Sequence, residues 1–121
     1  MAQALIDRIL VDARVIIADR RFRSRGLEAV DAVGHECDPC AGVARRFCAV
    51  GAIIRSAYDL TGDHERAQTL GWQIAEMIAD ASCLRLPDGE EGGWALARLS
   101  DARGQAAVLR AIDALIDQRR A

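Results

Sequence analysis

The chain has 121 residues, of which 51% are hydrophobic and 28% are charged, and its formal net charge is −2 at pH 7. These values are typical of one globular domain, and a chain of this length buries about two-thirds of its unfolded surface without needing a disulfide or a metal for stability. The near-neutral charge argues against binding nucleic acid through bulk charge, and no apolar run reaches the roughly 18 residues of a membrane-spanning helix. The first residues also lack the basic segment and apolar stretch of a secretory signal, so we expect a soluble cytoplasmic protein.

The first third of the chain predicts a helix, a turn, a short helix and a loop. Hydrophobic residues over 2–19 recur every three or four positions, which is the period of an amphipathic helix. Residues 20–26 end this period and are predicted as a turn. Residues 27–33 are predicted as a short second helix, and residues 34–40, which contain Pro39, as a loop.

The rest of the chain predicts helices with recognisable capping residues. Residues 41–60 form one predicted helix that ends before Gly62, and Asp63 is the predicted N-cap of the next helix, which runs to about Ser82. Beyond it the sequence predicts an exposed loop at 86–93, one or two helical turns at 94–99, a capping pair at Ser100 and Asp101, and a final helix to about Gln118.

These elements predict an all-α fold, a single-domain bundle of four main helices with one short extra helix that spans residues 1–121. No segment shows the alternating pattern of a strand. Gly51 and Gly71 lie inside helical patterns at a cost of roughly 1 kcal/mol each in helix propensity, which is explained if neighbouring helices approach closely there. We expect Cys48 and Gly51 to be packing residues on the inner side of their helix.

Residues 46–53, Arg-Phe-Cys-Ala-Val-Gly-Ala-Ile, resemble the aromatic-Cys-x-x-Gly-Ala-Leu signature of a family of small helical bacterial proteins classed as a domain of unknown function. The segments 22–26, 38–46 and 96–113 are similar to other parts of that family's pattern, although Leu99-Ser100 replaces its Trp-Asn. The resemblance implies an all-α fold and a bacterial source. It implies no reaction.

The sharpest candidate for chemistry is the His-x-Cys-x-x-Cys segment at residues 35–40. A Cys-x-x-Cys turn can present two thiolates to Zn²⁺, and a histidine with a further cysteine completes a tetrahedron. Cys48, however, falls in an apolar segment where a thiol packs as a small hydrophobe. We therefore expect no metal and no other cofactor, and the alternative is zinc bound by His35, Cys37, Cys40 and Cys48.

Cys37 and Cys40 also have the spacing of a redox pair. A redox enzyme of the thioredoxin kind needs a βαβ context, which the helical pattern does not provide. A metal- or thiol-dependent protein using Cys37, Cys40 and Cys48 therefore stands as an alternative function.

Nucleic-acid binding is a further alternative. Arg20, Arg21, Arg23 and Arg25 surround Phe22, a combination that neutralises phosphates and stacks bases. Acidic residues on both sides balance this cluster, so we expect an exposed basic turn whose phenylalanine docks onto the bundle.

Two single polar residues have simpler interpretations. His64 lies between Asp63 and Glu65 and is expected at the surface, where such a cluster offers a weak metal contact. Asp101 could act as a general base, but an N-cap at the start of the final helix accounts for it.

No Ser-His-Asp set, phosphate loop or zinc-protease motif is present, so we expect no catalytic residues. The leading interpretation is a non-enzymatic interaction or binding module for an unidentified protein or small-molecule partner. The first helix carries Val11 and Val15 beside its main apolar stripe, and the final helix is similarly broad. This breadth favours a homodimer.

Overall fold

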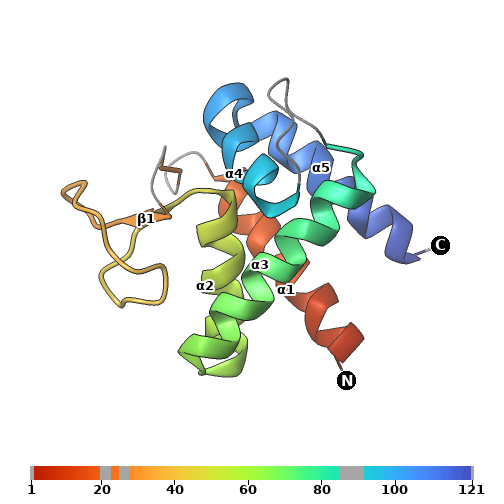
Figure 1. Ribbon diagram of the computed structural model, residues 1–121. Helices are drawn as coiled ribbons and strands as arrows, with labels where there is room; N and C mark the ends of the chain where they lie inside the picture. Colours follow the sequence, from red (N-terminus) through yellow and green to blue (C-terminus); the bar gives the residue numbers. More distant parts are fainter. Residues whose placement is uncertain (1, 20–22, 25–27, 85–91, 121) are drawn as a thin grey trace.

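A computed structural model describes residues 2–19, 23–24, 28–84 and 92–120, and within these ranges the fold is mainly helical (Figure 1). The prediction of an all-α domain is confirmed. None of the described helices is both long and apolar enough to cross a membrane. The elements in chain order are α1 (Ala2–Ala18), β1 (Ala29–Val30), β2 (Arg46–Phe47), α2 (Ala49–Thr61), α3 (His64–Ala81), α4 (Gly92–Arg103) and α5 (Gln105–Arg120).

Helix α2 is the centre of the bundle and packs against α1, α3 and α4. Eight of its thirteen residues are buried, and Ile53 and Ile54 are completely buried. Burying a side chain of this size stabilises the fold by about 1.5–3 kcal/mol. The remaining sides of the core come from α1 and α5, which pack together, and from buried isoleucines of α3, Ile74 and Ile78.

The turn between α2 and α3 confirms two sequence predictions. Gly62 ends α2 with a left-handed φ of 68°, and its N–H donates to the carbonyl of Tyr58. Asp63 is the N-cap of α3, since its carboxylate accepts from the N–H of Arg66. Glu65 lies in the first turn of α3, where a negative charge is favourable. The two helices therefore form an antiparallel hairpin joined by this short turn (Figure 1).

The segment before α2 differs from its prediction. Residues 29–30 form β1 where a short helix was predicted, and they pair antiparallel with β2, which the sequence placed inside the helix at 41–60. The backbone amides of this segment have partners that a helix cannot supply, because Arg45 donates to Val30 (2.9 Å) and Cys48 donates to Glu28 (3.1 Å). Helix α2 consequently begins only at residue 49, and Cys48 is its N-cap.

The prediction for the segment around residue 100 is also wrong. Helix α4 spans twelve residues, not the one or two turns predicted at 94–99. It includes Asp101, which therefore does not cap the final helix. The break before α5 comes at Gly104, whose φ of 82° is left-handed, so the chain changes direction three residues later than the sequence suggested. Of the predicted loop at 86–93, residues 86–91 lie outside the described residues, and Gly92 and Gly93 belong to α4.

Both helical glycines of the prediction lie at close approaches. A Cβ at Gly71 would lie 2.3 Å from Cγ1 of Ile54, so α2 and α3 pack closely there, as expected. At Gly51 the neighbour is not a helix: a Cβ would lie 1.8 Å from the carbonyl oxygen of Glu28, in the segment that leads into β1. Gly51 is thus the residue that allows the strand pair to rest on the first turn of α2.

Helix α4 docks onto α3 through a pair of tryptophans. The rings of Trp72 and Trp94 have their centroids 5.2 Å apart and are tilted by 44°. Gly93 lies beneath them, since a Cβ there would be 2.8 Å from Cε3 of Trp72. Trp94 is still 66% exposed, so the pair closes the junction at the surface and not in the core.

The contact at Gly51 makes a stability prediction. We expect Gly51→Ala to lower the free energy of unfolding by about 1–3 kcal/mol, because the added methyl overlaps a backbone carbonyl that cannot rotate away, and this outweighs the gain in helix propensity. Urea unfolding followed by circular dichroism measures the change. Gly42→Ala is the matched control, since a Cβ there meets nothing within 4 Å, and should change stability by no more than about 0.5 kcal/mol. Equal midpoints for the two variants would contradict the packing account.

Candidate functional site

The loop between β1 and β2 is shaped by local hydrogen bonds of aspartates. The Asp31 carboxylate accepts from the backbone N–H of Val33 (3.0 Å) and His35 (2.9 Å), and Gly34 has a left-handed φ of 93°. Such side-chain acceptors offer the backbone an alternative to a helix. The loop therefore has a defined shape without regular secondary structure.

The second half of this loop is fixed to α2 by Arg55. Its Nη1 donates to the carbonyl of Pro39 (3.2 Å) and to that of Ala41 (2.8 Å), while its Nε pairs with Asp59 (3.1 Å). Pro39 is fully buried. Residues 38–41 are thus held beside the middle of the central helix.

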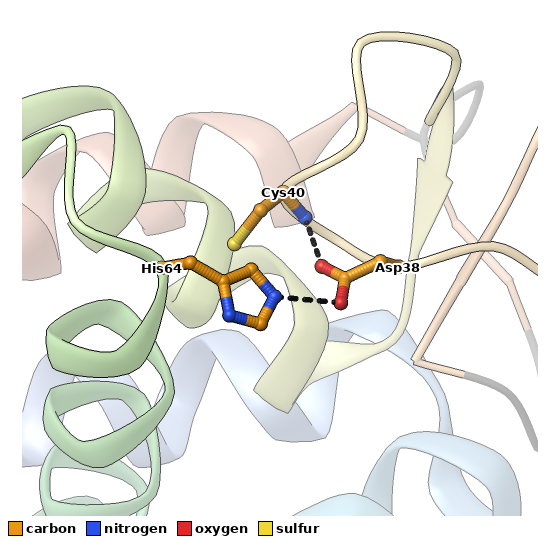
Figure 2. Close-up of side chains that lie close together, drawn as sticks. All are labelled: Asp38, Cys40 and His64. Carbon is orange, nitrogen blue, oxygen red and sulfur yellow. Dashed lines mark hydrogen bonds and ion pairs between the residues drawn. The ribbon is translucent and has the colours of Figure 1, made fainter.

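Asp38, Cys40 and His64 come together where this loop meets the start of α3, and we call them the loop–helix cluster (Figure 2). Oδ1 of Asp38 accepts from the backbone N–H of Cys40 at 2.8 Å, and Oδ2 lies 2.8 Å from Nε2 of His64. One carboxylate oxygen, the Cys40 sulfur and one imidazole nitrogen all lie within 4.8 Å of one another. Asp38 and His64 are exposed and Cys40 is half-buried.

Asp38 and His64 each stabilise the charged form of the other, whereas the environment of Cys40 and Cys37 stabilises the protonated thiol. The hydrogen bond with His64 lowers the pKa of Asp38, and the same bond raises the pKa of His64. Burial, followed by the charge of Asp38, raises the pKa of Cys40 to about 11. Burial and nearby acidic groups also raise the pKa of Cys37. In the absence of a bound cation both thiols are protonated at neutral pH, unlike the thiolate of a nucleophilic or redox cysteine.

The structure does not bring together the four residues of the alternative zinc site. The side chain of His35 is 83% exposed and lies 3.9 Å from Asp31. The buried thiol of Cys48 accepts from the N–H of Gly51 (3.3 Å), which makes it an N-cap instead of a residue inside its helix. Of the predicted set only Cys40 belongs to the loop–helix cluster, and all four cysteines are free thiols.

His64 was recognised in the sequence with the wrong partner. The sequence placed it with Asp63 and Glu65, its chain neighbours, whereas its hydrogen-bonding partner is Asp38, 26 residues earlier. Two local signals point to the site: Asp38-Pro39 ends a loop, and His64 starts a helix directly after the Gly62 turn. Only the folded loop shows that these two points meet.

Most of the basic turn of the nucleic-acid hypothesis lies outside the described residues. This holds for Arg20, Arg21, Phe22 and Arg25. Arg23 is described, is half-buried, and has its guanidinium beside Gly104 at the start of α5. The hypothesis therefore stays a prediction.

A second surface of interest is the outer side of α1. Five of its exposed residues, Ala4, Arg8, Val11, Val15 and Ala18, form what we call the α1 outer stripe. Val11 and Val15 are 48% and 67% exposed. Beside them a groove of about 370 Å³ follows the junction of α1 and α5. It is lined by Val11, Arg14, Val15, Asp113, Ile116, Asp117 and Arg120.

Comparison with family models, with curated proteins and with solved structures found no match for this sequence. The resemblance to the bacterial family of unknown function is therefore carried by its motif residues alone.

The Asp38–His64 pair makes a prediction for the titration of His64. Removing the charge with Asp38→Asn should lower the pKa of His64 toward 6.5, because the paired carboxylate stabilises the protonated imidazole. The pair's contribution to stability is accordingly present between about pH 4 and about pH 6.5, and it is lost as the pH rises through the raised pKa of His64 or falls through the lowered pKa of Asp38. Nuclear magnetic resonance titration of the imidazole protons measures the shift.

Asp63→Asn is the matched control for this titration, since it removes a neighbouring charge that acts less strongly on His64 and keeps the N-cap acceptor of α3. It should move the pKa of His64 less than Asp38→Asn does. A larger effect of Asp63→Asn would show that the pair does not exist in solution.

Proposed function

We propose that this chain is a non-enzymatic interaction module of the bacterial cytoplasm, and that its primary partner is a second copy of itself bound through the α1 outer stripe. The observation that carries the proposal is the exposed, regularly spaced stripe of α1. The motif resemblance supports the bacterial source, and the free thiols fit the reducing conditions of a cytoplasm.

The spacing of the stripe is that of a helix–helix seam. Its residues, at positions 4, 8, 11, 15 and 18, are separated by alternating steps of four and three, which is the spacing of the a and d positions of a coiled coil. The opposite face of α1 already contributes Ile9, Leu10 and Ala13 to the core. The helix therefore carries, besides its buried face, an outer stripe of two valines and two alanines with Arg8 among them, which its own chain leaves exposed.

The stripe is self-complementary about a two-fold axis. In an antiparallel pair of α1 helices centred between Val11 and Val15, each Val11 lies opposite Val15 of the other copy. The same register places Arg8 of one copy opposite Ala18 and Asp19 of the other. Arg8, which pairs with Asp12 of its own chain at 3.3 Å, then covers an alanine with its aliphatic stem and brings its guanidinium close to a second carboxylate, twice in each dimer.

The groove beside the stripe supports the same occupant. Its walls combine the apolar side chains of Val11, Val15 and Ile116 with charged residues of both signs. Arg14 and Asp113 cross it as a two-bond ion pair, with N–O distances of 2.7 and 3.0 Å, which fixes α5 beside α1. A rigid rim of mixed charge suits another copy of the same surface better than a strongly charged partner.

Light scattering at micromolar concentration tests the proposal. The chain should have about twice its mass of 13.1 kDa, and Val15→Glu should reduce the measured mass toward one chain because it buries an unpaired charge in the seam. Val33→Glu is the matched control: this valine is 79% exposed in the β1–β2 loop, away from α1, and its substitution should leave the mass unchanged. A single-chain mass for the unmodified protein across this range contradicts the proposal.

A charge exchange tests the register. Arg8→Glu should weaken the dimer through repulsion from Asp19, and adding Asp19→Arg to it should restore the dimer. Failure of the double variant to recover, with unchanged helical circular dichroism, would exclude the antiparallel arrangement.

A further inference from the structure

We propose that Asp38, Cys40 and His64 form a binding site for a divalent transition-metal ion of the zinc type. The inference is independent of self-association, because the three side chains belong to one chain and to elements other than α1. It departs from the sequence expectation of no metal, and it differs from the alternative zinc set of the sequence analysis in two of its three ligands.

The donor set matches this class of ion. A carboxylate oxygen, a thiolate sulfur and an imidazole nitrogen are the three kinds of donor that proteins use for zinc. Around a tetrahedral ion with bonds of about 2.0–2.3 Å, donors lie about 3.3–3.8 Å apart. The donors of the cluster lie within 4.8 Å of one another, so adjustments of about 1 Å bring them to that geometry. The side chains of Asp38 and His64 are exposed, so rotation about their side-chain bonds can make such adjustments while the backbone stays in place.

The surrounding structure already orients the ligands. Oδ1 of Asp38 is engaged by the N–H of Cys40, which leaves Oδ2 directed at Nε2 of His64 (Figure 2). The carbonyls of Pro39 and Ala41, the residues before and after Cys40, both accept from Arg55, and the backbone of His64 is fixed by its place in the first turn of α3. Such outer contacts set the orientation of metal ligands. A bound ion takes the place of the Asp38–His64 hydrogen bond, and Cys40 loses its proton to water as it binds.

The local charge favours a cation. Asp63 and Glu65 flank His64 and act on it electrostatically, and Asp59 acts on Cys40. Arg55, whose positive charge also acts on Cys40, is itself paired with Asp59. Three protein ligands leave one position of a tetrahedral ion for water, so the site is of the open kind and faces solvent.

Titration with Co²⁺, which reports thiolate ligation optically, tests the site on the whole protein. The unmodified chain should develop a sulfur-to-cobalt charge-transfer band in the near ultraviolet and visible bands of tetrahedral cobalt, saturating at one ion per chain. Cys40→Ser should abolish the charge-transfer band. His64→Ala and Asp38→Asn should each weaken cobalt binding by about tenfold or more. All three residues lie at or near the surface, and circular dichroism checks that the variants fold.

Cys37→Ser and His35→Ala are the matched controls. They remove the neighbouring thiol and imidazole of the same loop and should leave the spectrum and the affinity unchanged. The Val15→Glu variant should also bind cobalt normally, which separates this inference from the proposed dimer. Absence of the charge-transfer band in the unmodified chain, or its loss in Cys37→Ser with its retention in Cys40→Ser, would overturn the assignment.

Discussion

The approach of one carbonyl group to the start of α2 is the constraint on which the rest of the structure depends. The carbonyl of Glu28 accepts the N–H of Cys48 and occupies the space that a side chain at Gly51 would fill. A single peptide group therefore fixes the first half of the chain to the helix that forms the centre of the core. Burial in this crowded place, with Asp38 and Glu36 nearby, raises the pKa of the Glu28 carboxyl. Steric contact with Gly51 sets the position of Glu28, and the raised pKa of its carboxyl is a consequence of that position.

The loop–helix cluster follows from this constraint. With β1 held against the start of α2, the loop between the strands runs along the side of that helix, where Arg55 binds the carbonyls of Pro39 and Ala41. The middle of the loop, at Asp38, thereby reaches His64 at the start of α3. Three contacts place these side chains, which come from distant parts of the sequence, close to one another: the Cys48–Glu28 hydrogen bond, the hydrogen bonds of Arg55 to the loop, and the Asp63 N-cap of α3. Each of them is weak on its own.

The sequence predicted well where the signal is local. Gly62, Asp63 and Glu65 mark the α2–α3 turn by their own backbone and charge preferences, and the structure confirms each of them. It failed over residues 28–33 and 41–48, because two-residue strands leave no periodic pattern and pair residues that are 16 and 18 apart in the sequence. The cluster was missed for the same reason: Cys40 and His64 were both noticed, but their meeting depends on a loop path that no local preference encodes.

The tryptophan pair has a consequence for how this molecule can be observed. Both tryptophans of the chain lie at the α3–α4 junction, with their rings in contact. Intrinsic fluorescence therefore reports the docking of α4 alone, and is insensitive to events on α1 or in the β1–β2 loop. Circular dichroism reports the helices as a whole. If α4 detaches before the rest of the bundle melts, the two signals will separate in a denaturation curve, and the chain carries its own probe for this partial unfolding.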